Sequence, residues 1–484
     1  MGAVRTLQAR CVALTVLEQD ALLYLASGLL ALGTYAMAVS TDYREWAAMS
    51  TGPYLLAGAC CWLVSRRRAA RGKRERRDAH DVLRRGLVLG LLLTTVLIPL
   101  SVEIALRAQG SQGAQAQVEI AVIERCGDRV ANGHNCYLTH PATVGKSPSS
   151  DNPSIDANSY FPYLPGMIVF GLINAVPGPL GLKDARVALS GFALLVVTGA
   201  LMLVDIPSRR RWRIFQVAIV LPTGALPMVT GGDDLPVIAL LLLSIALATR
   251  RRPVWSGLAM GVAGTLKFTA WPVLLLMTLG ERDRQGRRAI LRYWLALLAV
   301  VGPVLGLGVG SDVHGFVENV IKFPLGLTGI RSPAASPLIG QELVTLFPAF
   351  KPEIVALLAL IGGSAVCYAL WRWPPDGPTP VARFAGLAMG LAILIAPATR
   401  FGYFIYPLNL LTWAYLLKPD ADEDPTGEPA GLGGSSSKRT GQDPSGIWKR
   451  RSLRTVDGAD WSDPASDGEI RGLTDVTSTP TSHS

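Results

Sequence analysis

The sequence predicts an all-α, polytopic membrane protein with about twelve membrane-spanning segments. Three observations support this fold class. Half of the 484 residues are hydrophobic. Apolar runs of about 17–20 residues recur along the chain, and a helix of that length crosses a hydrocarbon core. The lysines and arginines that give the net charge of +10 concentrate between these runs, as expected for loops on the cytoplasmic face of a membrane.

The predicted elements begin with two transmembrane helices within residues 1–64. The strongly basic segment 65–85, SRRRAARGKRERRDAHDVLRR, follows as a loop, and a core of spans occupies 86–417. The tail 418–484 is rich in Gly, Ser, Thr, Pro and Asp, which predicts disorder. The predicted spans cover residues 21–39, 48–64, 86–106, 187–205, 214–230, 235–249, 254–280 as a pair, 290–310, 354–371, 380–397 and 401–417.

Segment 65–85 determines the predicted orientation, because so many arginines belong on the cytoplasmic side. Counting spans from this segment places both termini in the cytoplasm and residues 107–186 on the outer side. The expected location of the protein is the plasma membrane. The later arginine clusters then fall inside as well. Nucleic acid is not an expected partner, because the positive charges lie in the loops between predicted spans and the sequence contains no nucleic-acid-binding motif.

Residues 253–280 form an apolar run with arginines at both ends. As one helix it would measure about 42 Å, against a hydrocarbon core of about 30 Å, and would put arginines on both membrane faces. We therefore predict a broken hairpin whose bend carries Lys267, helped by Gly264 and Pro272. An intramembrane lysine is costly and indicates a functional site, the alternative being a lysine that extends to the surface from an ordinary loop.

The expected outer segment opens with a helical pattern over 118–131 that carries Glu119, Glu124 and Asp128. Glu124 and Asp128 are four residues apart and share a helix face, whereas Glu119 could face inward. One carboxylate at a membrane surface can accept a proton from an attacking hydroxyl, so each of the three is a candidate base. The alternative is a solvated acidic helix face.

The outer side is also expected to contain short helices that do not cross the membrane. Segment 162–181 and part of 311–340 are too short, or too broken by proline and glycine, to cross the membrane, and predict short helices on the outer face. Cys126 and Cys136 could form a disulfide if this side faces an oxidising compartment. No metal-ligand spacing is present, so neither a metal nor another cofactor is expected.

Two outer turns carry further candidate residues. Asp233 and Asp234, in TGGDDLP, could bind sugar hydroxyls or a metal, or could cap the helix that follows. Arg400, in APATRFGYFIYP, is a cation on the side where few are expected, and a phosphate would explain it. Tyr403 and Tyr406 lie at the same membrane boundary. A carboxylate, cations and amphipathic walls together suit group transfer from a lipid phosphate.

Over about 86–417 the chain resembles glycosyltransferase family 87, in the C-type (GT-C) superfamily. Glu119 stands 18 residues before Tyr137, at the place of the family's early acidic residue. SYFPYLPGM resembles its Tyr-Pro-Pro-like entry to a short helix, and GGDDLP with GLAMGVAGTLKFTAWP resembles its outer turn and lysine-containing run. The chain departs from the pattern in having Glu119 in place of Asp and in separating Pro162 from Pro165.

The resemblance implies a metal-independent, inverting mannosyltransferase. It also implies a polyprenyl-phosphate sugar donor, a lipid or glycan acceptor and surrounding membrane lipids as partners. Glu119 is the first candidate base, Glu124 the second and Asp128 the third. Lys267 and Arg400 are expected to hold the donor phosphate. The sugar or acceptor pocket is expected to include Tyr163, Asp233, Asp234 and Tyr403.

Two other functions remain open at this point. A transporter or lipid flippase would have internal repeats and charges near the bilayer midplane, and the sequence has no convincing repeat. A non-enzymatic scaffold would depend on its cytoplasmic tail and not on the outer segment.

Overall fold

The computed structural model describes residues 14–70, 77–110, 116–137, 159–175, 183–324, 328, 334 and 336–417. The chain divides into two compact units, Met1–Asp422 and Glu423–Ser484, and every described residue belongs to the first. The predicted disordered tail therefore lies outside the described residues. All elements with defined bounds in the described part are helices, which confirms the predicted class.

The labels below use α for α-helices and η for short 3-10 or π-helical stretches. The order is α2 (Val16–Met37), α3 (Thr41–Ala70), α4 (Arg77–Leu91), η1 (Leu92–Leu97), α5 (Ile98–Ala108), α6 (Val118–Ala131), η3 (Pro165–Met167), α8 (Ile168–Gly171), η4 (Leu172–Ala175), α9 (Ala185–Leu203), α10 (Ser208–Phe215), η6 (Gln216–Val220), α11 (Pro222–Thr230), α12 (Leu235–Thr249), α13 (Pro253–Leu266), η7 (Phe268–Ala270), α14 (Trp271–Ser311), α15 (Val313–Phe316), η8 (Val317–Lys322), α16 (Ile339–Leu346), η9 (Pro348–Phe350), α17 (Lys351–Arg372), α18 (Pro378–Ile395), η10 (Phe401–Phe404) and α19 (Ile405–Leu416).

Each predicted span coincides with a helix of the structure. Eight helices in the described ranges are long and apolar enough to cross a membrane. The other four predicted spans correspond to shorter helices: α12, α13, α19 and the first part of α14. The predicted basic loop 65–85 is largely helical, because α3 continues to Ala70 and α4 already begins at Arg77. The membrane helices thus extend past their apolar runs.

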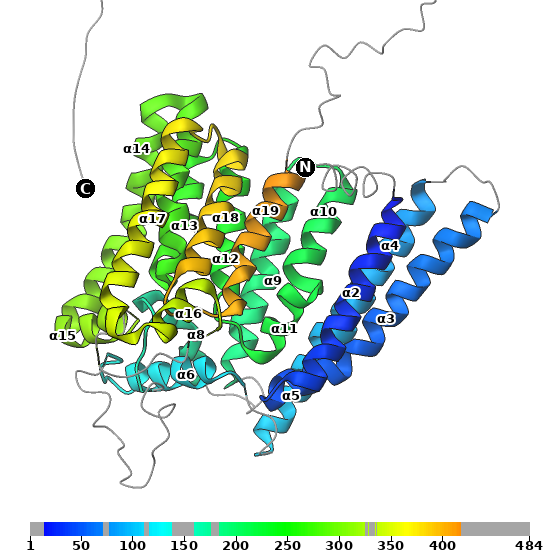
Figure 1. Cartoon of the computed structure of the whole chain (residues 1–484), viewed down its shortest axis with the longest axis horizontal. Helices are drawn as coiled ribbons and strands as arrows, with labels where there is room; N and C mark the ends of the chain where they lie inside the picture. The colour runs from blue at the N-terminus through cyan, green and yellow to red at the C-terminus, as the bar shows by residue number, and fades with distance from the viewer. Residues whose placement is uncertain are drawn as a thin grey trace, which may run out of the picture. The chain divides into compact units, whose positions relative to one another are not determined.

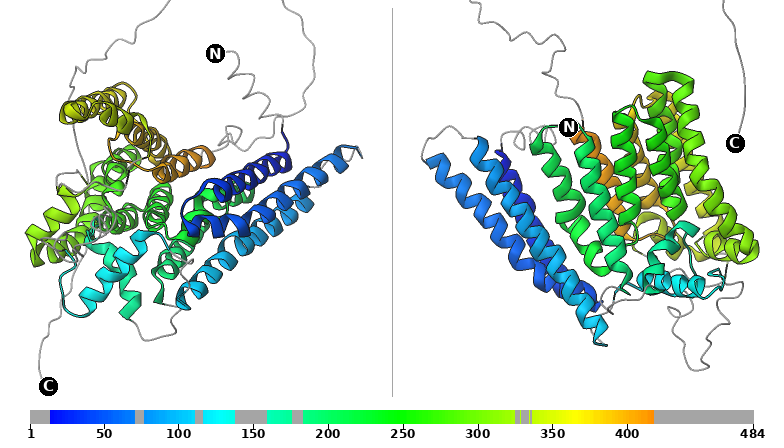
Figure 2. Two further views of the ribbon diagram at one scale, coloured as in Figure 1. Left: turned by 60° about the horizontal axis from the view of Figure 1, so that its bottom comes forward. Right: turned by 180° about the vertical axis from the view of Figure 1, so that it is seen from behind.

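Within the first unit the helices run side by side, and α6 lies across one end of them (Figures 1 and 2). We call this end, which also carries α8, α15 and α16, the α6 end. The opposite end carries the arginine clusters and is called the basic end. Its described members include Arg66, Arg67, Arg84, Arg85, Arg209, Arg210, Arg211, Arg213, Arg250, Arg251, Arg252, Arg287 and Arg288.

Buried polar contacts join the N-terminal helices to the core at the basic end. Arg84 on α4 forms an ion pair with Asp20 on α2 at 2.8 Å, and both side chains are almost fully buried. Arg84 also donates to the side chain of Gln216 on η6 at 2.9 Å. A buried charge must be paired to be tolerated, so this set of contacts determines where α2 and α4 meet the core.

The predicted broken hairpin is present. α13 ends at Leu266, Lys267 is extended with φ −148° and ψ 149°, and η7 leads into α14. Gly257 lets α13 approach α14 closely, since a Cβ there would lie 2.3 Å from the carbonyl oxygen of Tyr293. α14 then turns at Gly286, whose φ of 63° suits glycine. The bend at Lys267 lies at the α6 end, beside the segment that leads into η3.

Candidate active site

α6 holds Glu119 through contacts at its first turn. The backbone N–H of Gln117, the residue before the helix, donates to the Thr230 carbonyl at 2.9 Å. Its side chain donates to the Tyr43 hydroxyl at 2.6 Å and to the Thr230 hydroxyl at 3.0 Å. Ile120, the residue after Glu119 in this turn, is fully buried. The start of α6, and Glu119 with it, is therefore tied to both α3 and α11.

Glu119 and Arg400 form an ion pair and a hydrogen bond between the start of α6 and the turn after α18. These residues are 281 positions apart in the chain. The Glu119 side chain is 19% exposed and the Arg400 side chain 35% exposed, so the pair remains reachable from outside the protein. The structure thus brings the first candidate base to one of the two predicted phosphate-binding cations.

Lys267 bridges two carboxylates. Its ammonium nitrogen lies 2.9 Å from Asp233 and 2.6 Å from Asp234, and its side chain is only 11% exposed. The Tyr406 hydroxyl donates to the same Asp234 oxygen at 2.7 Å. Asp234 stands at the N-cap position of α12, but its side chain makes no capping hydrogen bond. The capping alternative is therefore wrong for Asp234, because its carboxylate is used by Lys267 and Tyr406.

Two tyrosine rings complete the surroundings of Lys267. Its ammonium nitrogen lies 5.4 Å from the ring centroid of Tyr163 and 5.9 Å from that of Tyr403, within the range of cation–π attraction. Burial raises the pKa of Tyr163 well above its ordinary value of 10.0, and the charges of Asp233 and Glu119 raise it further. Tyr163 is thus near enough to Lys267 for ring contact and near enough to Glu119 for its charge to act on it, so the Lys267 cluster and the Glu119–Arg400 pair belong to one site.

Glu124 lies in a different set of contacts. Its two oxygens accept from Arg107 on α5 at 2.9 and 2.7 Å, and one of them also accepts from the backbone of Ala185 at 2.9 Å. Arg107 also pairs with Asp184 at 2.8 Å, and Asp184 pairs with the fully buried Arg186. These contacts hold α5, α6 and α9 together.

Asp128, the third candidate base, is exposed near the far end of α6. Its carboxylate has a long contact of 3.5 Å with the side-chain amide of Asn174. The shared face predicted for Glu124 and Asp128 is thus divided, with Glu124 buried and Asp128 exposed. Neither residue has a contact with Lys267 or Arg400 among the interactions of the described residues.

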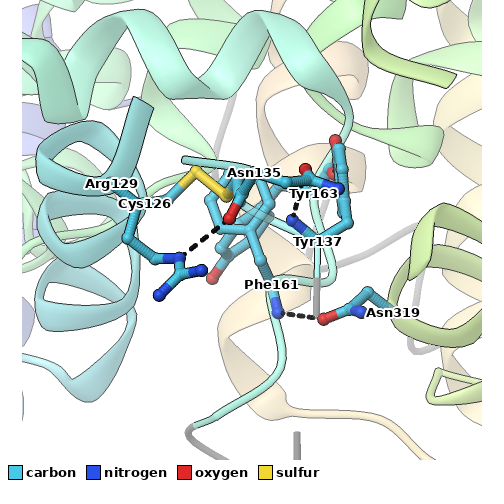
Figure 3. Close-up of a disulfide and its surroundings, with 8 residues drawn as sticks. Cys126, Arg129, Asn135, Tyr137, Phe161, Tyr163 and Asn319 are labelled. Atoms are coloured by element: carbon cyan, nitrogen blue, oxygen red, sulfur yellow. Dashed lines mark hydrogen bonds between the residues drawn. A yellow bond between two sulfur atoms is a disulfide. The ribbon is translucent and has the colours of Figure 1, made fainter. Parts of the chain in front are cut away.

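A disulfide joins Cys126 and Cys136, so the pairing that the sequence left open is present in the structure (Figure 3). Beyond it, the Tyr137 hydroxyl donates to the Tyr163 carbonyl at 3.0 Å. The backbone N–H of Leu164 donates to the Leu266 carbonyl at 3.1 Å. Both contacts hold the peptide group that joins Tyr163 to Leu164, and through Tyr137 the disulfide segment supports the site.

Sequence reasoning missed three contributors: Tyr43, Gln117 and Thr230. Thr230 opens the TGGDDLP turn, but nothing in the sequence marks it or the other two as contacts of α6, because their partners lie far away in the chain. Tyr406 was expected to be an aromatic residue at the membrane boundary, but it is 1% exposed and donates to Asp234. The apolar neighbours of Tyr406 in the sequence give no sign of that partner.

Three carboxylates and two cations make up the charged part of the site. Burial raises the pKa of Asp234 above its ordinary value of 3.8, and the neighbouring Lys267 opposes that rise. A proton on Asp234 would balance the charges of the cluster. In the part of the chain that the structure describes, no three His, Cys, Asp or Glu side chains are grouped as metal ligands.

A bundle of apolar helices with a charged site at one end defines the class of a membrane-embedded enzyme or transporter. Residues 161–397 match the model of glycosyltransferase family 87. This confirms the resemblance predicted from the sequence and identifies a membrane glycosyltransferase. No curated protein and no solved structure matches the chain. The matched region, which runs from 161 to 397, includes Tyr163, Asp233, Asp234 and Lys267. Glu119 lies well before its start, and Arg400 lies just after its end.

Proposed function

We propose that this protein transfers a hexose, mannose in the first instance, from a polyprenyl-phosphate donor to an acceptor hydroxyl at the α6 end. The observation that carries the proposal is the convergence of residues from separate segments. Glu119 pairs with Arg400, and Lys267 pairs with Asp233 and Asp234. A carboxylate beside two cations is the minimum that a direct displacement at a phosphate-linked sugar requires.

In this proposal Lys267 and Arg400 bind the donor phosphate. Both are paired with carboxylates in the structure, so the phosphate competes for them. Arg400 is the more exposed of the two and presents a fork of donors that suits a phosphate. When Arg400 turns to the phosphate, the Glu119 carboxylate is released from its ion pair and can accept the proton of the acceptor hydroxyl. Donor binding would therefore activate the base.

The reaction is a single displacement. The acceptor oxygen attacks the anomeric carbon, and the bond from that carbon to the phosphate oxygen breaks with its electron pair on the phosphate. Glu119 takes the proton of the acceptor hydroxyl. Lys267 and Arg400 stabilise the negative charge on the leaving phosphate. One displacement inverts the configuration at the anomeric carbon, and a single carboxylate is sufficient for it.

Two independent features support an extracytoplasmic site. The Cys126–Cys136 disulfide lies at the α6 end, and disulfides persist in oxidising compartments. The arginine clusters lie at the opposite end, as the positive-inside rule requires of a cytoplasmic face. We therefore place the site on the outer face of the plasma membrane, where the acceptor is a lipid or a growing glycan.

The test is transfer of radiolabel in membranes that contain the full-length protein. Polyprenyl-phosphate-mannose is compared with the corresponding glucose and galactose donors, with and without EDTA. We expect label from the mannose donor to enter a lipid or polymer fraction at the same rate in EDTA. Membranes without the protein provide the background rate. Transfer from none of the three donors above that background would contradict the proposal, and transfer from another donor would correct the sugar.

A further inference from the structure

A groove lies at the basic end, far from the charged cluster at the α6 end. It runs between α9, α12 and α13, is open to the outside and has a volume of about 440 Å³. It is lined by Met202, Leu203, Leu247, Arg250, Arg252 and Trp255. The walls are apolar, and the two arginines stand at the turn between α12 and α13.

The two arginines differ in how they are held. Arg250 donates through Nε to the Leu203 carbonyl, which leaves its two terminal nitrogens directed away from that bond. Among the interactions of the described residues, neither those nitrogens nor the guanidinium of Arg252 has a protein partner. Both side chains are exposed. Two guanidinium groups beside one groove can therefore accept an anion without first breaking an ion pair.

The backbone between the arginines is unusual. Arg251 has a φ of 55° and is the one non-glycine residue with a positive φ in the described part of the chain. Its N–H donates to the Ala248 carbonyl, and the N–H of Arg252 donates to the Leu247 carbonyl. This is the helix-ending turn in which glycine usually occupies the left-handed position. The turn places both Arg250 and Arg252 in the lining of the groove.

The apolar part of the groove opens outward from the protein. Met202 is 72% exposed, Trp255 is 58% exposed and Leu203 is 39% exposed. Apolar side chains of this kind at the level of a membrane helix contact acyl chains, and tryptophan prefers the headgroup boundary. The groove therefore offers cations at the headgroup level and apolar walls beneath them.

We propose that this groove binds one anionic glycerophospholipid, with its phosphate on Arg250 and Arg252 and an acyl chain along Met202 and Trp255. The positive-inside rule puts this end in the leaflet that holds anionic lipids, and basic pockets between helices on that face bind such headgroups. The proposal is independent of the transfer reaction, because none of its residues belongs to the site at the α6 end.

The test is native mass spectrometry of the full-length protein in a neutral detergent. Phosphatidylglycerol and phosphatidylcholine with identical acyl chains are added in turn. We expect one phosphatidylglycerol to remain bound with about tenfold higher affinity than phosphatidylcholine, a difference of about 1.4 kcal/mol. The double variant Arg250→Gln/Arg252→Gln should lose this preference. The control Arg287→Gln/Arg288→Gln removes the same charge from another exposed site of the basic end and should keep it.

Two further arms keep the test decisive. The double variant could unfold, because Arg250 also donates a hydrogen bond to the Leu203 carbonyl. In that case Arg252→Gln alone is tested, and it should weaken phosphatidylglycerol binding severalfold. Met202→Trp obstructs the groove while keeping both arginines, and should weaken it as well. Equal retention of phosphatidylglycerol by these variants and the wild type would overturn the proposal. Displacement by an equal concentration of inorganic phosphate would also overturn it, since the site would then bind a free anion.

Discussion

Among single residues, Lys267 separates a role in ligand binding from a role in folding. Lys267→Met would leave Asp233 and Asp234 without their cation in a buried place. Removing one partner of a buried ion pair typically costs about 3 kcal/mol of stability. We also expect the KM for the donor to rise about tenfold, equivalent to about 1.4 kcal/mol of lost phosphate binding.

The double variant Lys267→Met/Asp233→Asn provides the control for this prediction. Removing one carboxylate together with the lysine should restore part of the stability, which thermal unfolding in detergent measures. It should not restore the KM for the donor, which initial transfer rates measure. If KM recovers along with stability, Lys267 serves the fold and not the phosphate.

Asp184 predicts how the stability of the protein depends on pH. Burial alone would raise the pKa of this carboxyl, but its bonds to Arg186 and Arg107 outweigh burial and lower the pKa below 3.8. Such a group stabilises the fold at pH values above its pKa in the unfolded chain, and this contribution is lost as pH falls through the folded value. We therefore expect a loss of stability below about pH 4.

Thermal unfolding between about pH 6 and about pH 3 measures this effect. Asp184→Asn should be less stable than the wild type at the upper pH, because Arg186 loses a buried partner. Its stability should also fall less on acidification. If the stability of Asp184→Asn falls with pH in parallel with that of the wild type, the Asp184 ion pairs contribute nothing to the acid sensitivity.

At the scale of elements, the first turn of α6 is held by α3. The Tyr43 hydroxyl accepts a hydrogen bond from Gln117, two positions before Glu119. Tyr43→Phe should cost about 1 kcal/mol of stability or less. We expect kcat to fall severalfold with little change in the KM for the donor, because the base is displaced while the phosphate-binding cations stay in place. Tyr35→Phe, at a half-exposed tyrosine of α2, is the matched control. Unchanged kcat in Tyr43→Phe would remove α3 from the positioning of Glu119.

The elements themselves were largely predictable, because membrane helices follow from the lengths of apolar runs. The sequence pattern over 118–131 predicted α6 with its observed bounds, and the excess length of 253–280 predicted the break at Lys267. The partners of the charged residues were not predictable. Glu119 meets Arg400, and Lys267 meets Asp234, across long separations that no local pattern encodes. Asp234 illustrates the limit, since its sequence context suggested a sugar or metal ligand or a helix cap, and not an ion pair with Lys267.

At the scale of the whole molecule, the site combines parts inside and outside the family match. Residues 161–397 contribute Lys267, Asp233, Asp234 and Tyr163, while α6 and the turn before η10 add Glu119 and Arg400. Every residue assigned to the site precedes the second unit, Glu423–Ser484. We therefore expect a protein that ends at Asp422 to keep its transfer rate within about twofold of the full chain. A scaffold that works through its tail would instead lose its activity with the same truncation.

The central claim is that Glu119 is the base of a sugar-transfer site, and one comparison tests it most directly. Initial rates of mannose transfer are measured for purified wild type, Glu119→Gln and Glu342→Gln, each normalised to folded protein. Glu342 is an exposed glutamate on α16 at the same end of the molecule, so it controls for the chemical change alone. We predict a fall of about 10²-fold or more in kcat for Glu119→Gln, as for the loss of a general base, and a wild-type rate for Glu342→Gln. A Glu119→Gln enzyme that transfers mannose at the wild-type rate would contradict the account.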